Sequence, residues 1–229
     1  MSYGEFSFLL EFAEAIEQAA KRGVVLPEEY YEHLPEEARA RAFTVSHLAS
    51  LEQIKAVLDS LRDALDGGDS FEMWRDAFGD PGLGDAHLET IYRNAMQNAY
   101  NAGRWRQQTE NAFARPILMY DAVDDSRTRP EHAALDGFMA PVGDPVWASI
   151  YPPNGHRCRC AVISLTREQA EARGFAPGAR PGGKPDEGWG HNPAGGDLSD
   201  REREALRGIA QEIEEAYRRR ANEQRGEQP

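Results

Sequence analysis

The chain has 229 residues, of which 40% are hydrophobic and 28% charged, so it can bury a core as one large domain or two smaller ones. It lacks an apolar run of the roughly 18 residues that a membrane span needs, and acidic residues stand where a secretory signal would be basic. We therefore expect a cytosolic protein. The formal charge of −13 disfavours a general DNA coat, because binding to the DNA backbone requires Lys and Arg.

The charge is unevenly distributed along the chain. Residues 1–90 hold 7 basic and 19 acidic side chains, whereas residues 91–180 hold 11 and 9. All the basic residues of the middle third are arginines, which pair in bidentate fashion with carboxylate or phosphate. These arginines either form internal ion pairs or present a surface to an acidic partner.

The N-terminal half has mostly helical patterns. Apolar residues at helical spacing predict a helix over residues 5–21, and two Leu-Pro pairs predict a loop with short helical turns over residues 26–46. Ser50 and Gln53 form a capping box for a further helix that ends at Gly67 and Gly68. Its apolar stripe comprises Leu51, Ile54, Leu58, Leu61 and Leu65.

Two more helices are expected before the pattern changes. Ser70 can cap a short helix that ends at Phe78, and Asp85 can cap a long helix that reaches about Gln108. The long helix carries a broad apolar face, which predicts a central position between other elements. That face comprises Leu88, Ile91, Tyr92, Ala95, Met96 and Ala99.

The remainder of the chain predicts an α+β fold. Short apolar runs between residues 116 and 165 are typical of strands and ordered loops. We divide the chain into a helical N-terminal region (1–84), a compact α+β domain (85–173), a Gly/Pro-rich extended segment (174–198) and a charged, solvated C-terminal helix (199–229).

A block of thiols and imidazoles offers metal ligands. Cys158 and Cys160 are the only cysteines of the chain, and His132 and His156 lie in the same block. Thiolate and imidazole suit a tetrahedral structural zinc site, and a C-x-C pair in extended backbone can direct both sulfurs to one ion. The alternative is a pair of reduced thiols packed as small hydrophobic groups.

Carboxylates in the same block leave an enzymatic alternative open. His132 with Asp121, Asp124 or Asp125 could form a hydrolytic metal or acid–base centre. These carboxylates could equally cap backbone amides or pair with arginines. The sequence contains no G-x-S-x-G, H-E-x-x-H or P-loop motif.

Two tryptophans stand in loop-like surroundings. Trp147 lies in DPVW and Trp189 in GWGHNP. Since tryptophan is strongly buried on average, we expect each to pin its loop to the core, with contact to a partner as the alternative.

Four features of this region occur in a fixed order. They are Asp125-Ser126-Arg127-Thr128 leading to His132, then Trp147 in DPVW, then PPNG followed by CRC, and finally WGHNP. Together they resemble the phage Mu F-like family of head morphogenesis (minor capsid) proteins. The resemblance covers roughly residues 40–195.

The resemblance implies a minor structural protein of a tailed-phage head with no enzymatic activity. Such a protein enters the procapsid, contacts the portal protein or the major capsid protein, and helps DNA packaging or ejection. It would be found in the virion and, during assembly, in the host cytoplasm. Arg157 and Arg159 are the candidates for contact with the portal or with packaged DNA.

The resemblance also bears on the metal site. A histidine near the C-R-C motif of relatives completes what looks like a zinc knuckle, but it commonly stands where this chain has Gly155. We therefore expect a structural zinc bound by His132, Cys158, Cys160 and His156. The alternative is a small metal-dependent hydrolase, a nuclease or protease, acting in head maturation or DNA entry.

Overall fold

The computed structural model describes residues 24–25, 42–43, 51–79 and 82–194, together with residues 208, 211–213, 215–216, 218–220 and 222. The helix predicted over residues 5–21 lies outside the described residues. Two short strands, β1 (Val24–Val25) and β2 (Ala42–Phe43), pair in parallel. The second falls within the stretch predicted to be a loop, because a two-residue strand depends on a distant partner and leaves no local pattern.

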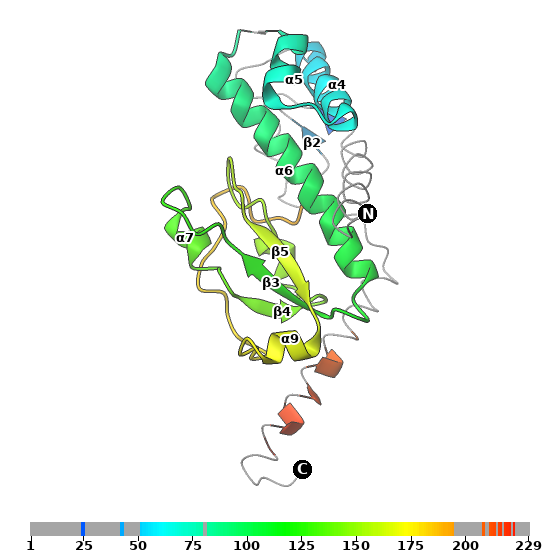
Figure 1. Ribbon diagram of the computed structural model, residues 1–229, viewed down its shortest axis with the longest axis vertical. Coiled ribbons are helices and arrows are strands. Elements are labelled where there is room, and N and C mark those ends of the chain that lie inside the picture. Colours follow the sequence, from blue (N-terminus) through cyan, green and yellow to red (C-terminus); the bar gives the residue numbers. More distant parts are fainter. Residues whose placement is uncertain are drawn as a thin grey trace, which may run out of the picture.

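Three helices form one end of the molecule (Figure 1). Helix α4 is Leu51–Gly67 and helix α5 is Phe71–Phe78, where the Ser70 hydroxyl accepts a hydrogen bond from the Met73 amide. Both helices agree with the predicted positions, but Ser50, which belongs to the capping box predicted for α4, lies outside the described residues. Their apolar faces enclose a cluster of buried residues: Ile54, Val57, Leu58, Leu61, Ala64, Trp74 and Leu88.

Helix α6 (Asp85–Glu110) connects this helical end to the rest of the fold. Its first half packs on α4 and α5, and its second half contributes Ala102 and Trp105 to a separate core. The predicted central position is therefore confirmed. The predicted cap is wrong, since Gly84 with φ 71° precedes the helix and Asp85 is its first residue.

A three-stranded antiparallel sheet follows, in the order β4-β3-β5. The strands are β3 (Ile117–Asp121), β4 (Met139–Pro141) and β5 (Ala161–Leu165). The alternation of β3 places Leu118 and Tyr120 against the core that α6 shares, while Ile117 joins a cluster on the other face. The expected α+β fold is confirmed.

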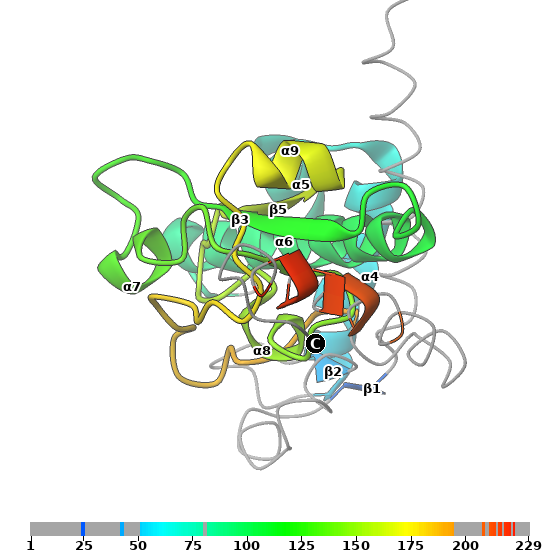
Figure 2. The same cartoon turned by 90° about the horizontal axis from the view of Figure 1, so that it is seen from below.

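Short helices and loops cover the sheet. Helix α8 (Trp147–Ile150) and helix α9 (Arg167–Glu171) lie on opposite sides of the strands in Figure 2. Helix α7 (Pro130–Ala133) lies at the edge, where the β3 to β4 connection turns back (Figure 1). Residues 174–194 contain no helix or strand.

The described residues near the C-terminus are helical, but they are not solvated on every side. Ile213 is fully buried against Ile117, Leu165 and Phe175. Arg220 pairs with Glu171 at 2.6 Å. The prediction of a solvated helix is corrected at this point, because one apolar side chain docks on the open face of the sheet.

Candidate metal centre

The loop before β5 presents the two cysteines to the interior. In the PPNG turn, Asn154 is fully buried and its Nδ2 donates to the Tyr120 hydroxyl at 3.0 Å and to the Ile150 carbonyl at 2.9 Å. The Cys158 amide then donates to the Gly155 carbonyl at 3.1 Å. These bonds hold the loop so that Cys158 and Cys160 are both buried.

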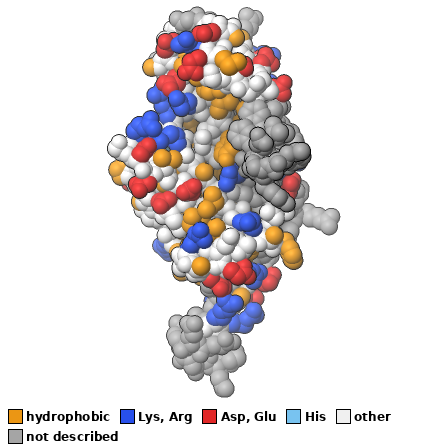
Figure 3. Space-filling model, in the orientation of Figure 1, with side chains coloured by type: hydrophobic (Ala, Val, Ile, Leu, Met, Phe, Trp, Pro, Cys, Tyr) orange, Lys and Arg blue, Asp and Glu red, His pale blue; other side chains and the backbone are white. Residues whose placement is uncertain are grey.

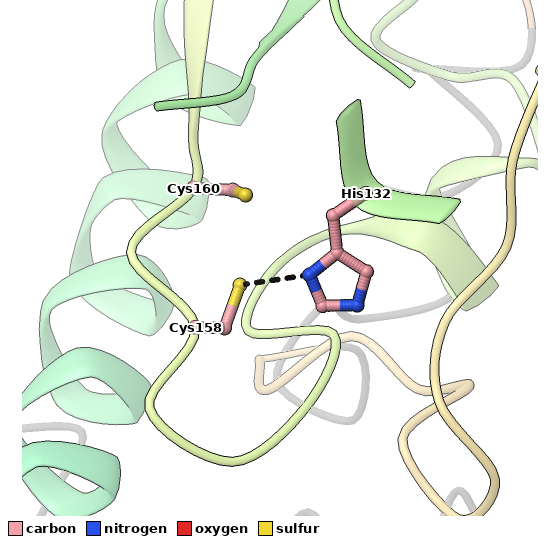
Figure 4. Close-up of side chains that lie close together, drawn as sticks. All are labelled: His132, Cys158 and Cys160. Atoms are coloured by element: carbon pink, nitrogen blue, oxygen red, sulfur yellow. Dashed lines mark hydrogen bonds between the residues drawn. The ribbon is translucent and has the colours of Figure 1, made fainter. Parts of the chain in front are cut away.

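His132 faces the cysteines from helix α7. Pro130 begins this short helix, where its fixed φ is favourable and no amide donor is required. His132 is 2% exposed, and its Nδ1 lies 3.8 Å from the Cys158 sulfur (Figure 4). Each of His132, Cys158 and Cys160 offers one ligand atom, and these three atoms lie within 4.8 Å of one another.

The two thiols change each other's pKa through a hydrogen bond. A hydrogen bond from Cys158 lowers the pKa of Cys160, and contacts with His132 and Tyr120 act in the same direction. The same bond, together with burial, raises the pKa of Cys158. The pair therefore loses its first proton more readily than an isolated buried thiol would, and thiolate is the form that binds a metal.

His156 does not join this group. Its Nδ1 lies 2.8 Å from the side-chain Nδ2 of Asn94 on α6, and its ring packs edge-on against Trp189 with centroids 5.0 Å apart. Extended backbone would place positions 156, 158 and 160 on one face. Arg157 instead adopts φ 56°, which breaks that alternation and turns His156 outward.

The D-x-R-T motif forms the turn beside the cysteine loop. The Asp125 carboxylate accepts hydrogen bonds from the Arg127 amide at 3.0 Å and from both Arg159 terminal nitrogens at 2.7 Å. The bidentate Arg159 contact holds the pKa of Asp125 well below its usual range. The Thr128 hydroxyl closes the turn by donating to the Val123 carbonyl.

Arg157 ties the cysteine loop to α6. Its guanidinium donates to Glu89 at 2.8 Å, to the Thr90 hydroxyl at 2.9 Å and to the Ala86 carbonyl at 3.0 Å. Arg157 and Arg159 therefore both make intramolecular contacts that shape the site. Their contact with DNA or a portal stays a prediction.

Trp147 anchors the preceding loop, as the sequence predicted. The side chain is fully buried between Phe138 and Tyr151, and its Nε1 donates to the Pro141 carbonyl at 2.9 Å.

The segment over residues 182–194, here called the strap, covers the site from the other side. Asp186 on the strap places one carboxylate oxygen 3.4 Å from His132 Nε2 and the other 3.2 Å from Arg129 Nε. At its end, Asn192 contacts the backbone of Ala148 and Trp147. Sequence reasoning missed Asp186, because nothing in its spacing connects it with His132.

The carboxylates considered for hydrolysis lie elsewhere. Asp121 and Asp124 are exposed. Within the described part of the chain, neither they nor Asp125 join the group formed by His132 and the cysteines.

A protein-family model matches the region that contains this site. The model of the family described as "Phage Mu protein F like protein" matches residues 55–163, a range that includes the D-x-R-T turn, His132 and both cysteines. Residues 55–163 belong to the phage Mu protein F-like family.

Two curated relatives agree with this assignment. The chain is 35% identical over 165 residues to the Mu-like prophage FluMu F protein of Haemophilus influenzae, covering 64% of this chain and 40% of the relative. It is 32% identical over 185 residues to the putative capsid assembly protein F of Escherichia phage Mu, covering 71% and 42%. The matches thus span about two fifths of each relative's length. No solved structure gives a significant match.

The Mu F-like domain contributes to a cleft of about 690 Å³ between the helical end and the cysteine loop. Ala64 and Leu65 of α4 and Met96 of α6 give it an apolar part. Five arginines also line it: Arg93, Arg127, Arg129, Arg157 and Arg159. In Figure 3, Lys and Arg side chains gather on one side of the molecule at the level where the helical end meets the rest of the fold.

The described helices are not suited to spanning a membrane. None of them combines the length and the apolar character that crossing a bilayer requires.

Proposed function

We propose that this chain acts in the assembly of a tailed-phage head as a minor structural protein. The observation that supports this most is the family match over the region that holds the D-x-R-T turn, His132 and the C-x-C pair. A relative named as a putative capsid assembly protein is in agreement. The finer proposal is contact with the portal or the inner capsid, with a role in DNA packaging or ejection.

The burial of the candidate ligands favours this function over a metal-dependent hydrolase. His132, Cys158 and Cys160 are each at most 5% exposed, whereas a hydrolytic metal needs a position open to substrate and water. Asp125 is the candidate catalytic carboxylate closest to His132 in sequence, and it is bound by Arg159. A buried set of ligands is suited to joining loops.

We propose that the buried group is a structural zinc site. Two thiols and one imidazole within 4.8 Å of one another are the donor types that zinc prefers. The protein would hold the ion through His132, Cys158 and Cys160, and the ion would cross-link α7 to the cysteine loop. The competing interpretation is a reduced thiol pair stabilised by hydrogen bonds alone.

Elemental analysis distinguishes these two interpretations. The purified protein is compared with the Cys158→Ser/Cys160→Ser variant, and each is scored for incorporation into procapsids. Stoichiometric zinc that the variant loses, together with failed incorporation, supports a structural site. Absence of metal with normal incorporation of the variant would return the cysteines to ordinary packing.

We further propose that the arginine-lined cleft receives an acidic surface of the portal or inner capsid. Five arginines line it. Glu89, Asp125 and Asp186 pair with them, and Asp69 also lines the cleft, so the arginines exceed these four carboxylates by one and an acidic partner would complement the remaining charge. DNA is the weaker candidate, because the whole chain carries −13 and DNA binding requires net positive charge over the contact.

Charge reversal on the rim of the cleft tests this contact. Arg93 and Arg127 are the suitable positions, since their side chains are 55% and 77% exposed, whereas Arg157 and Arg159 support the fold. We expect Arg93→Glu/Arg127→Glu to reduce incorporation into procapsids and Arg180→Glu, outside the cleft, to leave it unchanged. Incorporation that is insensitive to both salt and the double variant would overturn the proposal.

A further inference from the structure

Asp186 lies directly behind the imidazole that faces the cysteines. His132 Nδ1 is directed at Cys158, and Nε2, on the opposite side of the ring, lies 3.4 Å from an Asp186 carboxylate oxygen. Nε2 is buried and makes no hydrogen bond of good geometry. A buried ring nitrogen next to a carboxylate is therefore the second distinctive feature of the site.

The strap is held so that this carboxylate has little freedom. The Asp186 amide donates to the Asn154 carbonyl at 2.8 Å, and the Trp189 amide donates to the Asp186 carbonyl at 3.0 Å. The two carboxylate oxygens have different partners: Oδ1 faces His132, and Oδ2 faces Arg129 at 3.2 Å. Arg129 thus fixes the orientation of the carboxylate and leaves one oxygen for the imidazole.

Three glycines make this close approach feasible. An ideal Cβ at Gly183 would lie 1.8 Å from the Glu131 carbonyl oxygen, and one at Gly182 would lie 2.6 Å from the Ala134 carbonyl oxygen. The strap therefore packs backbone to backbone on the helix that carries His132. At Gly155 an added Cβ would lie 2.1 Å from Asp186 Oδ2, so the carboxylate occupies space that any side chain at position 155 would require.

A metal bound through Nδ1 places a chemical demand on the other ring nitrogen. Neutral imidazole carries one proton, so coordination at Nδ1 leaves that proton on Nε2. A buried N–H needs an acceptor, and a carboxylate in this place fixes the tautomer, orients the ring and increases its basicity as a ligand. Asp186 is placed to be that acceptor.

We propose that Asp186 is the positioning residue of the metal centre, holding His132 in the tautomer and orientation that bind the ion. This inference rests on the zinc site proposed above. It makes the strap part of the centre, because the residue that orients the ligand lies on this segment, far from His132 in sequence.

The test compares zinc affinities by competition with a chromophoric chelator. Asp186→Asn removes the charge with little change in shape, and Glu187→Gln, an exposed neighbour in the same turn, removes an equal charge as the matched control. We expect Asp186→Asn to weaken zinc binding roughly 10- to 100-fold and Glu187→Gln to leave it unchanged. When Co²⁺ replaces zinc, its absorption spectrum reports the metal coordination directly. A purely structural role of Asp186 would not alter this spectrum.

A second variant reaches the same interaction without changing Asp186. Gly155→Ala should displace the carboxylate and weaken zinc binding to a similar extent, and Gly155→Ala/Asp186→Ala should be no worse than Asp186→Ala alone. Unchanged zinc affinity and Co²⁺ spectrum in Asp186→Asn and Gly155→Ala would overturn the positioning role while leaving the metal site intact. Absence of metal from the parent protein would overturn both proposals, so the two failures are distinguishable.

Discussion

Substitution of Trp147 by Phe tests how the loop before the cysteines is held. The side chain is fully buried, and its Nε1 donates to the Pro141 carbonyl at 2.9 Å. Phe keeps an aromatic ring against Phe138 and Tyr151 but loses this donor and about two buried carbon atoms, at about 0.8 kcal/mol for each buried methylene-sized group. With about 1 kcal/mol for the hydrogen bond, we expect the free energy of unfolding to fall by about 2.5 kcal/mol.

Urea denaturation followed by circular dichroism measures this change. The control is Trp189→Phe, because Trp189 is only half-buried and should lose well under half as much stability. Zinc stoichiometry should stay the same in Trp147→Phe if the loop still reaches its position. A loss in Trp147→Phe no greater than in Trp189→Phe would refute the argument that this tryptophan anchors the loop.

Three further predictions concern the same fold. Tyr151→Phe removes the donor to Gln108 Oε1 at 2.8 Å and should lower the free energy of unfolding by about 1–3 kcal/mol, since a buried acceptor loses its partner; urea denaturation measures it. Ile213→Ala should cost about 2–5 kcal/mol in the same assay, because this fully buried side chain leaves a cavity; an unchanged midpoint would show that Ile213 is not docked. The lowered pKa of Asp125 predicts stability that is present above the ordinary Asp pKa of about 3.9 and lost as pH falls toward the lower folded value. Asp125→Asn should therefore be less stable than the parent at pH 7, and the difference should shrink in strong acid, in urea titrations at several pH values.

Local patterns predicted the helices well. Helices α4 and α5 follow from stripes of apolar residues and from glycine and serine at their ends, all of which are read within one or two turns. Strands β3 and β5 are likewise apolar runs between turn residues. The cap predicted for α6 is wrong because Asp is favourable in the first turn of a helix as well as at its N-cap. The residue type alone does not separate these two roles for Asp85.

Non-local pairing explains the features that were not predicted. Strand β4 has three residues and ends at Pro141, so only its pairing with β3 makes it a strand. Spacing predicts His156 to be a metal ligand, but the positive φ of Arg157 changes the direction of the loop. Asp186 approaches His132 through a long stretch without helix or strand, and such contacts have no signature in a single sequence.

Helix α6 sets the distance between the helical end of the molecule and the rest of the fold. Its 26 residues span about 39 Å at about 1.5 Å per residue, and the helix continues without interruption from one hydrophobic cluster into the next. Spin labels at its two ends should therefore report one narrow distance distribution. A partner surface bound at the α4–α5 end would therefore be held at a constant distance and orientation relative to the sheet.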